Sequence, residues 1–512
     1  MTDPADLILR NAEVHSLAPT GDTVTEAVAI RDGRIVRVDS DYEVEFLEGT
    51  ETTVRDCQGR VVLPGFIDAH THLTAVGRYA IHADLRRADS PGAAIEILSA
   101  HAAETSGWVQ GYGFDESTWT EDRYLTREDL DAVSPDRPVL ALREDGHTAA
   151  VNSVVLERFE DDLPPEGTRT EGGDPTGVLV EDAVEVVREA VSPDREETRA
   201  LIEAAQKIAH SRGVTGIHDM VRQSHAPAVY RELALADTLR LRVRLNYWSD
   251  HLEAAVETGL RTNHGGPWVR TGAIKSFTDG SFGGRTAKVS EPYADASEDS
   301  ATGQWVVDPE ALDSLVERAT DAGFQVALHA IGDDAVEVAL DVYEAYGTPT
   351  ARHRIEHAEL ADDEMIQRFA DAGVVASMQP NFLKWAREDG LYERRLGEAR
   401  AARTDRLGAF AAADVPLALG SDCMPMDPLV GIHQAVTAPR PDQRLSVTAA
   451  LRGYTHGAAV AGFDEDRMGT ITEGHLADLV VLDSSPWEHE DAIEDIAVTA
   501  TIVDGEIVDG AL

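Results

Sequence analysis

Hydrophobic and polar residues alternate along the first sixty residues of the chain, around short turn signals. ADLILRNAEV, EAVAIRDGRIVRV and TTVRDCQGRVV follow a two-residue period, and Asp32-Gly33 marks a tight turn. The pattern returns near the C-terminus in HLADLVVLD (475–483) and VTATIVDGEIVDG (498–510). We therefore expect a small β-sandwich built from both chain termini, residues 1–60 and 470–512.

Between these ends, short apolar runs alternate with stretches of helical period, which is typical of a parallel sheet made of βα units. Eight runs are candidate strands: 61–69, 213–219, 241–248, 269–277, 324–330, 353–359, 373–380 and 415–422. Eight parallel strands with helices between them predict an α/β fold, a (β/α)8 TIM barrel over residues 61–469.

One interval between the candidate strands is far too long for a simple connection. About 140 residues separate the first run from the second, whereas a βα unit needs about 30. We interpret residues 80–195 as an inserted α/β subdomain over the barrel mouth.

The charge of the chain is strongly unbalanced, with 93 Asp+Glu against 45 Lys+Arg and a net charge of −48. Such a surface repels phosphate, so a nucleic-acid partner and an anionic membrane are both excluded. Only four of the basic residues are lysines. An acidic, lysine-poor surface indicates halophilic adaptation to a salt-rich cytoplasm, because carboxylates stay hydrated and their repulsion is screened.

The two cysteines, Cys57 and Cys423, cannot form a disulfide framework or a cysteine zinc site. The N-terminus lacks the basic and apolar segments of a signal peptide, and no apolar run is long enough to span a bilayer. We therefore expect a cytoplasmic protein.

The first candidate strand ends in His70-Thr71-His72. Histidines at i and i+2 of a strand point the same way, so both imidazoles can reach one metal ion. The motif alone is weak, because 18 histidines in 512 residues yield about half an occurrence by chance. Its position at the C-terminal end of a strand, where barrel active sites form, makes it informative.

The ends of other candidate strands carry more residues of this kind. Lys275 lies on the fourth strand, and His329, His357 and Asp422 end the fifth, sixth and eighth. A single residue of this type is usually a hydrogen-bonded structural group. A whole series at the same end of successive strands predicts a metal site instead.

These motifs carry a family resemblance. PGFIDAHTH, IKSFTDGS, LHAIGD, RIEHAE and LGSDC, in this order, resemble the amidohydrolase superfamily of metal-dependent hydrolases. GYGFDESTW (111–119) and EGHLADLVVLD (473–483) are similar to its amidohydrolase-3 or YtcJ-like branch, which includes N-substituted formamide deformylases. The likeness runs from about residue 6 to residue 510. It is specific for fold and metal use and unspecific for substrate.

The resemblance implies a site for two divalent metal ions, zinc by default, with manganese or iron as alternatives. By analogy, His70, His72 and Asp422 hold one ion, and His329 and His357 hold the other. Lys275 is carboxylated by CO2 and bridges both, since an ammonium has no lone pair to offer a metal. The alternative for Lys275 is an ion pair with Asp279 or with a phosphate-type substrate.

The implied reaction is hydrolysis of a C–N bond in a small amide, formamide or N-acyl substrate. A metal-bridging hydroxide attacks the carbonyl carbon, and Asp422 shuttles the proton to the leaving amine. Two further histidines are weaker catalytic candidates: His218 at the end of the second strand, and His147 in the inserted subdomain, where it can reach over the mouth.

Two other functions stay open at this stage. In a mononuclear deaminase of an aromatic heterocycle, one ion binds to His70, His72, His329 and Asp422, and Lys275 binds nothing. In a catalytically silent barrel, the chain serves as a regulatory or binding protein. We expect a small-molecule substrate and no nucleic-acid or membrane partner, and we allow for a homodimer.

Overall fold

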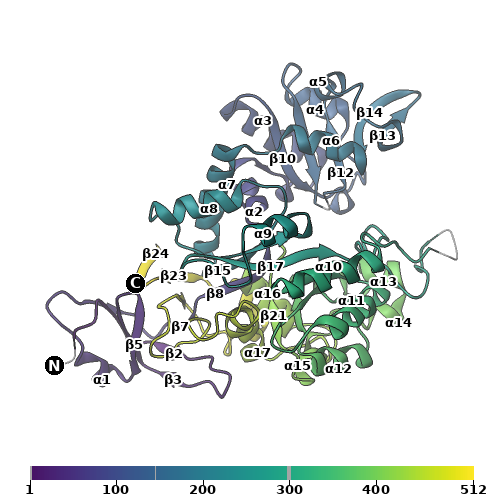
Figure 1. Ribbon diagram of the computed structural model, residues 1–512. Coiled ribbons are helices and arrows are strands. Elements are labelled where there is room, and N and C mark those ends of the chain that lie inside the picture. The colour runs from purple at the N-terminus through teal and green to yellow at the C-terminus, as the bar shows by residue number, and fades with distance from the viewer. Residues whose placement is uncertain (1–2, 145, 297–300) are drawn as a thin grey trace. The chain divides into compact units, whose positions relative to one another are not determined.

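The computed structural model describes residues 3–144, 146–296 and 301–512, and the chain divides into two compact units (Figure 1). The first unit comprises the chain up to His72 together with Gln206–Leu512. The second comprises Leu73–Ala205, a wider segment than the insertion predicted over 80–195. Helix α7 (Arg195–Ser211) runs through the second boundary.

The core of the first unit is a sheet of eight parallel strands in the order β21-β20-β19-β18-β17-β16-β15-β8. The strands, in chain order, are β8 (Phe66–Thr71), β15 (Val214–Val221), β16 (Arg242–Trp248), β17 (Val269–Phe277), β18 (Val326–Ala330), β19 (Arg354–His357), β20 (Val375–Met378) and β21 (Leu417–Leu419). They are buried almost throughout, as expected when helices cover a parallel sheet. The predicted TIM barrel is confirmed.

The two ends of the sheet approach one another where β21 meets β8. The backbone N–H of Asp422 donates to the carbonyl oxygen of His70 at 2.8 Å. The backbone N–H and hydroxyl of Ser421 both donate to the buried carboxylate of Asp68. These bonds nearly close the barrel at the carboxyl ends of its strands.

Helices connect successive strands of the barrel. The principal helices are α8 (Ala226–Leu235), α9 (Leu252–Glu257), α10 (Pro309–Asp321), α11 (Asp333–Tyr346), α12 (Asp363–Ala372), α15 (Leu407–Ala412), α16 (Pro428–Val436), α17 (Val447–Arg452) and α18 (Ala458–Ala461). Each of α10 and α12 begins at an aspartate whose side chain caps the first turn, Asp308 or Asp362. None of the described helices is both long and apolar enough to cross a lipid bilayer.

The run predicted as one strand over 61–69 is two strands in different sheets. Residues Val61–Pro64 form β7, and the barrel strand begins at Phe66. The N–H of Gly65 donates to the Asp478 carbonyl, while the N–H of Phe66 donates to the Gly213 carbonyl. A Cβ at Gly65 would lie 2.3 Å from the Thr215 hydroxyl, so the crossing between sheets requires glycine.

Residues from both chain ends form two further sheets (purple and yellow in Figure 1). One contains β1 (Leu7–Arg10), β4 (Ala27–Arg31), β5 (Arg34–Asp39) and β6 (Thr53–Asp56). The other contains β2 (Glu13–His15), β3 (Val24–Thr25), β7, β22 (Leu479–Leu482), β23 (Val498–Val503) and β24 (Glu506–Gly510). Leu9 and Val28 from the first share a buried cluster with Val62 and Val481 from the second. The predicted sheets from both termini are confirmed.

The second unit is an α/β structure around a six-stranded mixed sheet in the order β13-β14-β12-β11-β10-β9. Its strands are β9 (Ala83–Asp84), β10 (Val109–Phe114), β11 (Val139–Arg143), β12 (Thr148–Val151), β13 (Thr168–Glu171) and β14 (Asp174–Val180). Its helices include α2 (Leu73–Ile81), α3 (Pro91–Glu104), α4 (Arg127–Val133), α5 (Ser153–Arg158) and α6 (Asp182–Ala190). This unit has its own apolar core.

Candidate metal centre

The predicted metal ligands lie at the carboxyl ends of barrel strands. His70 is the penultimate residue of β8 and His72 lies just beyond the end of that strand, Lys275 is on β17, and His329 is on β18. His357 is the last residue of β19, and Asp422 follows β21. Since all eight strands are parallel, these ends share one face of the barrel.

Three of these side chains come together most closely. One ligand atom from each of His70, His357 and Asp422 lies within 4.8 Å of the other two. His72 borders this group, with Nε2 at 3.4 Å from Asp422 Oδ1. His329 lies on the other side, its ring centroid 4.5 Å from that of His357.

Two of these residues have unusual backbone conformations, which set the direction of their side chains. His357 and Asp422 have φ angles of 74° and 48°, in the left-handed region that non-glycine residues rarely adopt. In a regular strand, His357 would face opposite to Glu356. The left-handed turn at the strand end brings it beside His70 instead, and strain of this kind concentrates at functional sites.

A buried carboxylate orients His70. Oε2 of Glu356 lies 2.6 Å from Nδ1 of His70, and Arg354 donates to both oxygens of Glu356 at 2.8 and 3.1 Å. Burial raises the pKa of Glu356, but Arg354 and His70 outweigh burial and hold it below its usual range. The ionised carboxylate accepts the proton on Nδ1, so Nε2 presents its lone pair toward Asp422.

Backbone carbonyls set the tautomers of two other histidines in the same way. Nδ1 of His72 lies 3.2 Å from the Met220 carbonyl, and Nε2 of His329 lies 2.9 Å from the Gly280 carbonyl. A carbonyl can only accept, so these nitrogens carry the hydrogen. The lone pairs are therefore on His72 Nε2 and on His329 Nδ1.

Burial favours the neutral form of three of the imidazoles, those of His72, His329 and His357. It lowers the pKa of His72 to about 4, against the opposing attraction of Asp422. Burial also holds the pKa values of His329 and His357 well below the ordinary value, with further lowering from Lys275. Neutral imidazoles near pH 7 are the form that binds a metal ion.

Lys275 is buried in the barrel, and its Nζ has no hydrogen-bond partner among the described residues. Burial lowers its pKa to about 8, although Glu356 and Asp422 favour the charged form. The ion pair with Asp279 that the sequence left open is not formed. A buried amine that is partly neutral and unpaired fits reaction with CO2, which requires the free amine.

Asp279 does not pair with Lys275 but accepts hydrogen bonds from the backbone of two loops. Its carboxylate accepts backbone N–H groups of Gly332 and Lys288 at 2.8 Å, and it lies 3.6 Å from Nε2 of His329. Burial raises the pKa of Asp279 to about 7 against these hydrogen bonds. It ties the loop after β17 to the loop after β18, beside the candidate ligands.

The two other predicted catalytic histidines lie elsewhere. Nδ1 of His218 lies 2.8 Å from Nη1 of Arg354 and accepts its hydrogen bond. His218 is therefore linked, through Arg354 and Glu356, to the hydrogen bonds that orient His70. His147 belongs to the second unit, where its side chain is 66% exposed and lies 3.2 Å from Glu181. The catalytic roles of both stay predictions.

Sequence reasoning missed Glu356 and Arg354. Both lie in the RIEH segment, two residues apart on a strand that is buried on all sides. Charged residues at i and i+2 of a barrel strand point into the interior, where a charge needs a partner. This spacing could have predicted a buried ion pair between Arg354 and Glu356. It could not have predicted that Glu356 also contacts His70.

Comparison with known proteins agrees with this geometry. Residues 53–509 match a family model described as "Amidohydrolase family". The putative amidohydrolase YtcJ of Bacillus subtilis is 31% identical over 97% of this chain and 98% of its own length. An N-substituted formamide deformylase of Arthrobacter pascens is 27% identical over 99% and 98%. The crystal structure of an uncharacterized metal-dependent hydrolase from Pyrococcus furiosus superposes with a TM-score of 0.80 at 30% identity, covering 94% of this chain and 99% of that one.

Proposed function

Because this chain belongs to the amidohydrolase family, we propose that it is a metal-dependent hydrolase that cleaves the C–N bond of a small amide-type substrate. One observation carries the proposal: His70 and His357 converge with Asp422 at the carboxyl end of the barrel, which also holds a buried Lys275 whose Nζ has no hydrogen-bond partner among the described residues. Strand ends of this kind are where barrel enzymes bind their substrates.

The side chains divide into two sets of ligands. His70, His72 and Asp422 would hold one ion, with Asp422 Oδ1 at 3.8 and 3.4 Å from the two Nε2 atoms. His329 and His357 would hold the second, and Lys275, once carboxylated, would bridge the two. Nitrogen and oxygen ligands of this kind suit zinc first and also manganese or iron.

Divalent ions in such a site lower the pKa of water and polarise a substrate carbonyl. Asp422 is the residue placed to move a proton, because its side chain is partly exposed and adjoins His70 and His72. It would take the proton released on attack and deliver it to the leaving amine. Glu356 keeps the lone pair of His70 available throughout.

The first substrates to test follow from the relatives. The Arthrobacter pascens protein is an N-substituted formamide deformylase, so formamides and N-acyl amines come first. A hydrolase of this type releases an acid and an amine. A deaminase would release ammonia from a heterocycle instead, so product analysis separates the two reactions.

The decisive measurement is metal content per chain, by elemental mass spectrometry on protein purified without chelator and supplied with bicarbonate. We expect about two ions in the natural chain and a loss of at least one in Lys275→Ala. Lys207→Ala, which removes an exposed lysine of α7, is the matched control and should retain both ions.

Two results would overturn the proposal. About one ion that is unaffected by Lys275→Ala would indicate the mononuclear deaminase. No bound ion after reconstitution would indicate a catalytically silent barrel.

A further inference from the structure

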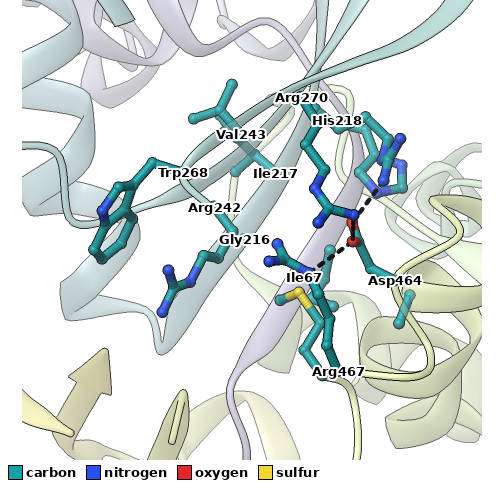
Figure 2. Close-up of a pocket in the computed structure, with 13 residues that line it drawn as sticks. Ile67, Gly216, Ile217, His218, Arg242, Val243, Trp268, Arg270, Asp464 and Arg467 are labelled. Carbon is teal, nitrogen blue, oxygen red and sulfur yellow. Dashed lines mark hydrogen bonds and ion pairs between the residues drawn. The ribbon is translucent and has the colours of Figure 1, made fainter. Parts of the chain in front are cut away.

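Buried polar side chains join separate segments at both ends of the barrel strands. Near the amino-terminal ends, Arg244 on β16 and Arg270 on β17 donate to the carboxylate of Asp464 at 2.7 and 2.9 Å (Figure 2). The candidate metal ligands lie at the opposite, carboxyl ends of the strands. There the side chain of Asn381 joins the two ends of a turn that contains one of these ligands, Asp422.

The turn comprises residues 421–424, just after β21. The backbone N–H of Met424 donates to the Ser421 carbonyl at 3.2 Å and closes the turn. Its two central residues, Asp422 and Cys423, have φ angles of 48° and 55°. Positive φ at both central positions is typical of a type I′ turn, in which glycine, asparagine and aspartate are favoured. Cysteine is not among them, so the turn is strained and depends on its surroundings to keep its shape.

Asn381 holds this turn at both ends. It is the second residue of the short helix η5 (Pro380–Trp385), which follows β20, and it is buried. Its Nδ2 donates to the carbonyl oxygens of Ser421 and of Met424, both at 2.8 Å. A carbonyl oxygen can only accept, so the NH2 group of the amide must face the turn. Both hydrogens of one side chain thus bind the first and the last residue of the turn.

This orientation leaves the oxygen of the amide unsatisfied. Oδ1 of Asn381 is buried and has no hydrogen-bond partner among the described residues, an arrangement that costs free energy. Asn152 in the second unit binds two carbonyls in the same way, those of Ser134 and Arg137, at 2.9 and 2.7 Å. Its Oδ1, however, accepts two backbone N–H groups. The orientation of Asn381 therefore serves the turn at the expense of its own hydrogen bonding.

Contacts from β8 hold the same turn at other atoms. The carboxylate of Asp68 accepts from the backbone N–H and the hydroxyl of Ser421. The carbonyl oxygen of His70 accepts from the N–H of Asp422 at 2.8 Å. These bonds fix the first two residues of the turn, and Asn381 adds a hold on Met424, its last residue.

We propose that Asn381 is a positioning residue for Asp422, and this inference rests on the proposed metal-dependent function. By holding both ends of the turn, Asn381 places the Asp422 carboxylate where it can share a metal ion with His70 and His72. Asp422 Oδ1 lies 3.8 and 3.4 Å from the Nε2 atoms of these histidines. Ligands must be held to within about 0.5 Å of the required geometry, so a small movement of the turn would weaken the site.

The first test is hydrogen exchange of the metal-free protein, measured by mass spectrometry on peptides that cover residues 417–430. In Asn381→Ala the turn loses the bonds at its two ends, so we expect this segment to exchange about tenfold faster than in the natural chain. Asn152→Ala also removes a buried amide that binds two carbonyls, and it is the control in which this segment should keep its natural exchange rate. Unchanged exchange in Asn381→Ala would overturn the proposal, because Asn381 would then not hold the turn.

The second test is the zinc dissociation constant, measured by chelator competition, together with the visible absorption spectrum of the cobalt-substituted protein. We expect Asn381→Ala to weaken zinc binding about 10–100-fold and to alter the cobalt spectrum, because the Asp422 carboxylate is displaced. Asn152→Ala should leave both unchanged. Natural affinity and an unaltered spectrum in Asn381→Ala would overturn this inference and leave the proposed function standing. A natural chain that binds no metal would overturn the proposed function, and this inference with it.

A second variant keeps the proposal testable if Asn381→Ala does not fold. Asn381→Asp preserves the size of the side chain, but a neutral carboxyl group has one O–H and can bind only one of the two carbonyls. We expect faster exchange over residues 417–430 and weaker zinc binding, both by less than in Asn381→Ala. Natural exchange and natural zinc affinity in this variant would contradict the proposal.

Discussion

Glu356→Gln tests how the barrel interior prepares His70 to bind a metal ion. The substitution keeps the shape of the side chain but replaces one carboxylate oxygen with an NH2 group. That group would face either the guanidinium of Arg354 or Nδ1 of His70. Facing His70, it donates to Nδ1 and moves the ring hydrogen to Nε2, which removes the lone pair from the metal side.

Two magnitudes follow from the geometry. Removing one partner of a fully buried ion pair costs about 3–5 kcal/mol, because Arg354 keeps a charge that no solvent reaches. Loss of a group that orients a metal-bound histidine lowers metal affinity about 10–100-fold. We therefore expect Glu356→Gln to reduce both the free energy of unfolding and the affinity for metal.

Asp478→Asn is a matched control that separates the loss of folding stability from the loss of metal affinity. Asp478 pairs with buried Arg242 at 2.9 and 3.1 Å, close to the distances between Glu356 and Arg354, but it lies among the terminal sheets. Asp478→Asn should also reduce the free energy of unfolding in urea, while the zinc dissociation constant, measured by chelator competition, stays unchanged. If Glu356→Gln binds zinc as tightly as the natural chain, Glu356 does not orient His70 and the reasoning fails.

Three further predictions concern catalysis, pH and packing. Asp422→Asn should reduce turnover of the substrate about 10²–10⁴-fold while elemental analysis finds metal retained, and full turnover would exclude the proton-transfer role. Burial lowers the pKa of His353 to about 4, below the ordinary 6.5, so the unfolded chain binds the proton first and stability falls as the pH drops from 6.5 to 4. That loss is about 2 kcal/mol at pH 5, and His353→Gln should flatten this part of the urea-unfolding profile; an unchanged slope would contradict the assignment. Gly420→Ala would place a Cβ 2.4 Å from the backbone nitrogen of His70, so it should destabilise the chain by about 1–3 kcal/mol and lower its metal content, whereas native-like stability and metal content would show that the contact relaxes.

Much of the candidate site could be predicted before the structure was known. His70, His72, Lys275, His329, His357 and Asp422 each end or follow a recognisable apolar run, and parallel strands place such ends on one face. The boundary at Gly65 was missed, because 61–64 and 66–71 are both apolar and periodicity cannot assign them to different sheets.

Contacts between distant residues could not be predicted in the same way. Glu356 and His70 are 286 positions apart, and Arg354 and His218 are 136 apart. Which interior side chains meet depends on strand order, strand register and barrel closure, and no local pattern reports these. His218 illustrates the limit: its place at a strand end suggested a catalytic role, yet its ring hydrogen-bonds to Arg354 inside the barrel.

The sequence by itself determined the barrel, the sheets from both termini and the strand ends that carry histidine, lysine and aspartate, because hydrophobic period and burial are local properties of a chain. Only the tertiary structure decided which nitrogens of His72 and His329 carry a hydrogen, that Glu356 contacts His70, and that Nζ of Lys275 has no hydrogen-bond partner in the part of the chain that the structure describes. Those features depend on hydrogen bonds and charges that act over a few ångströms, between residues that only the closed barrel brings together.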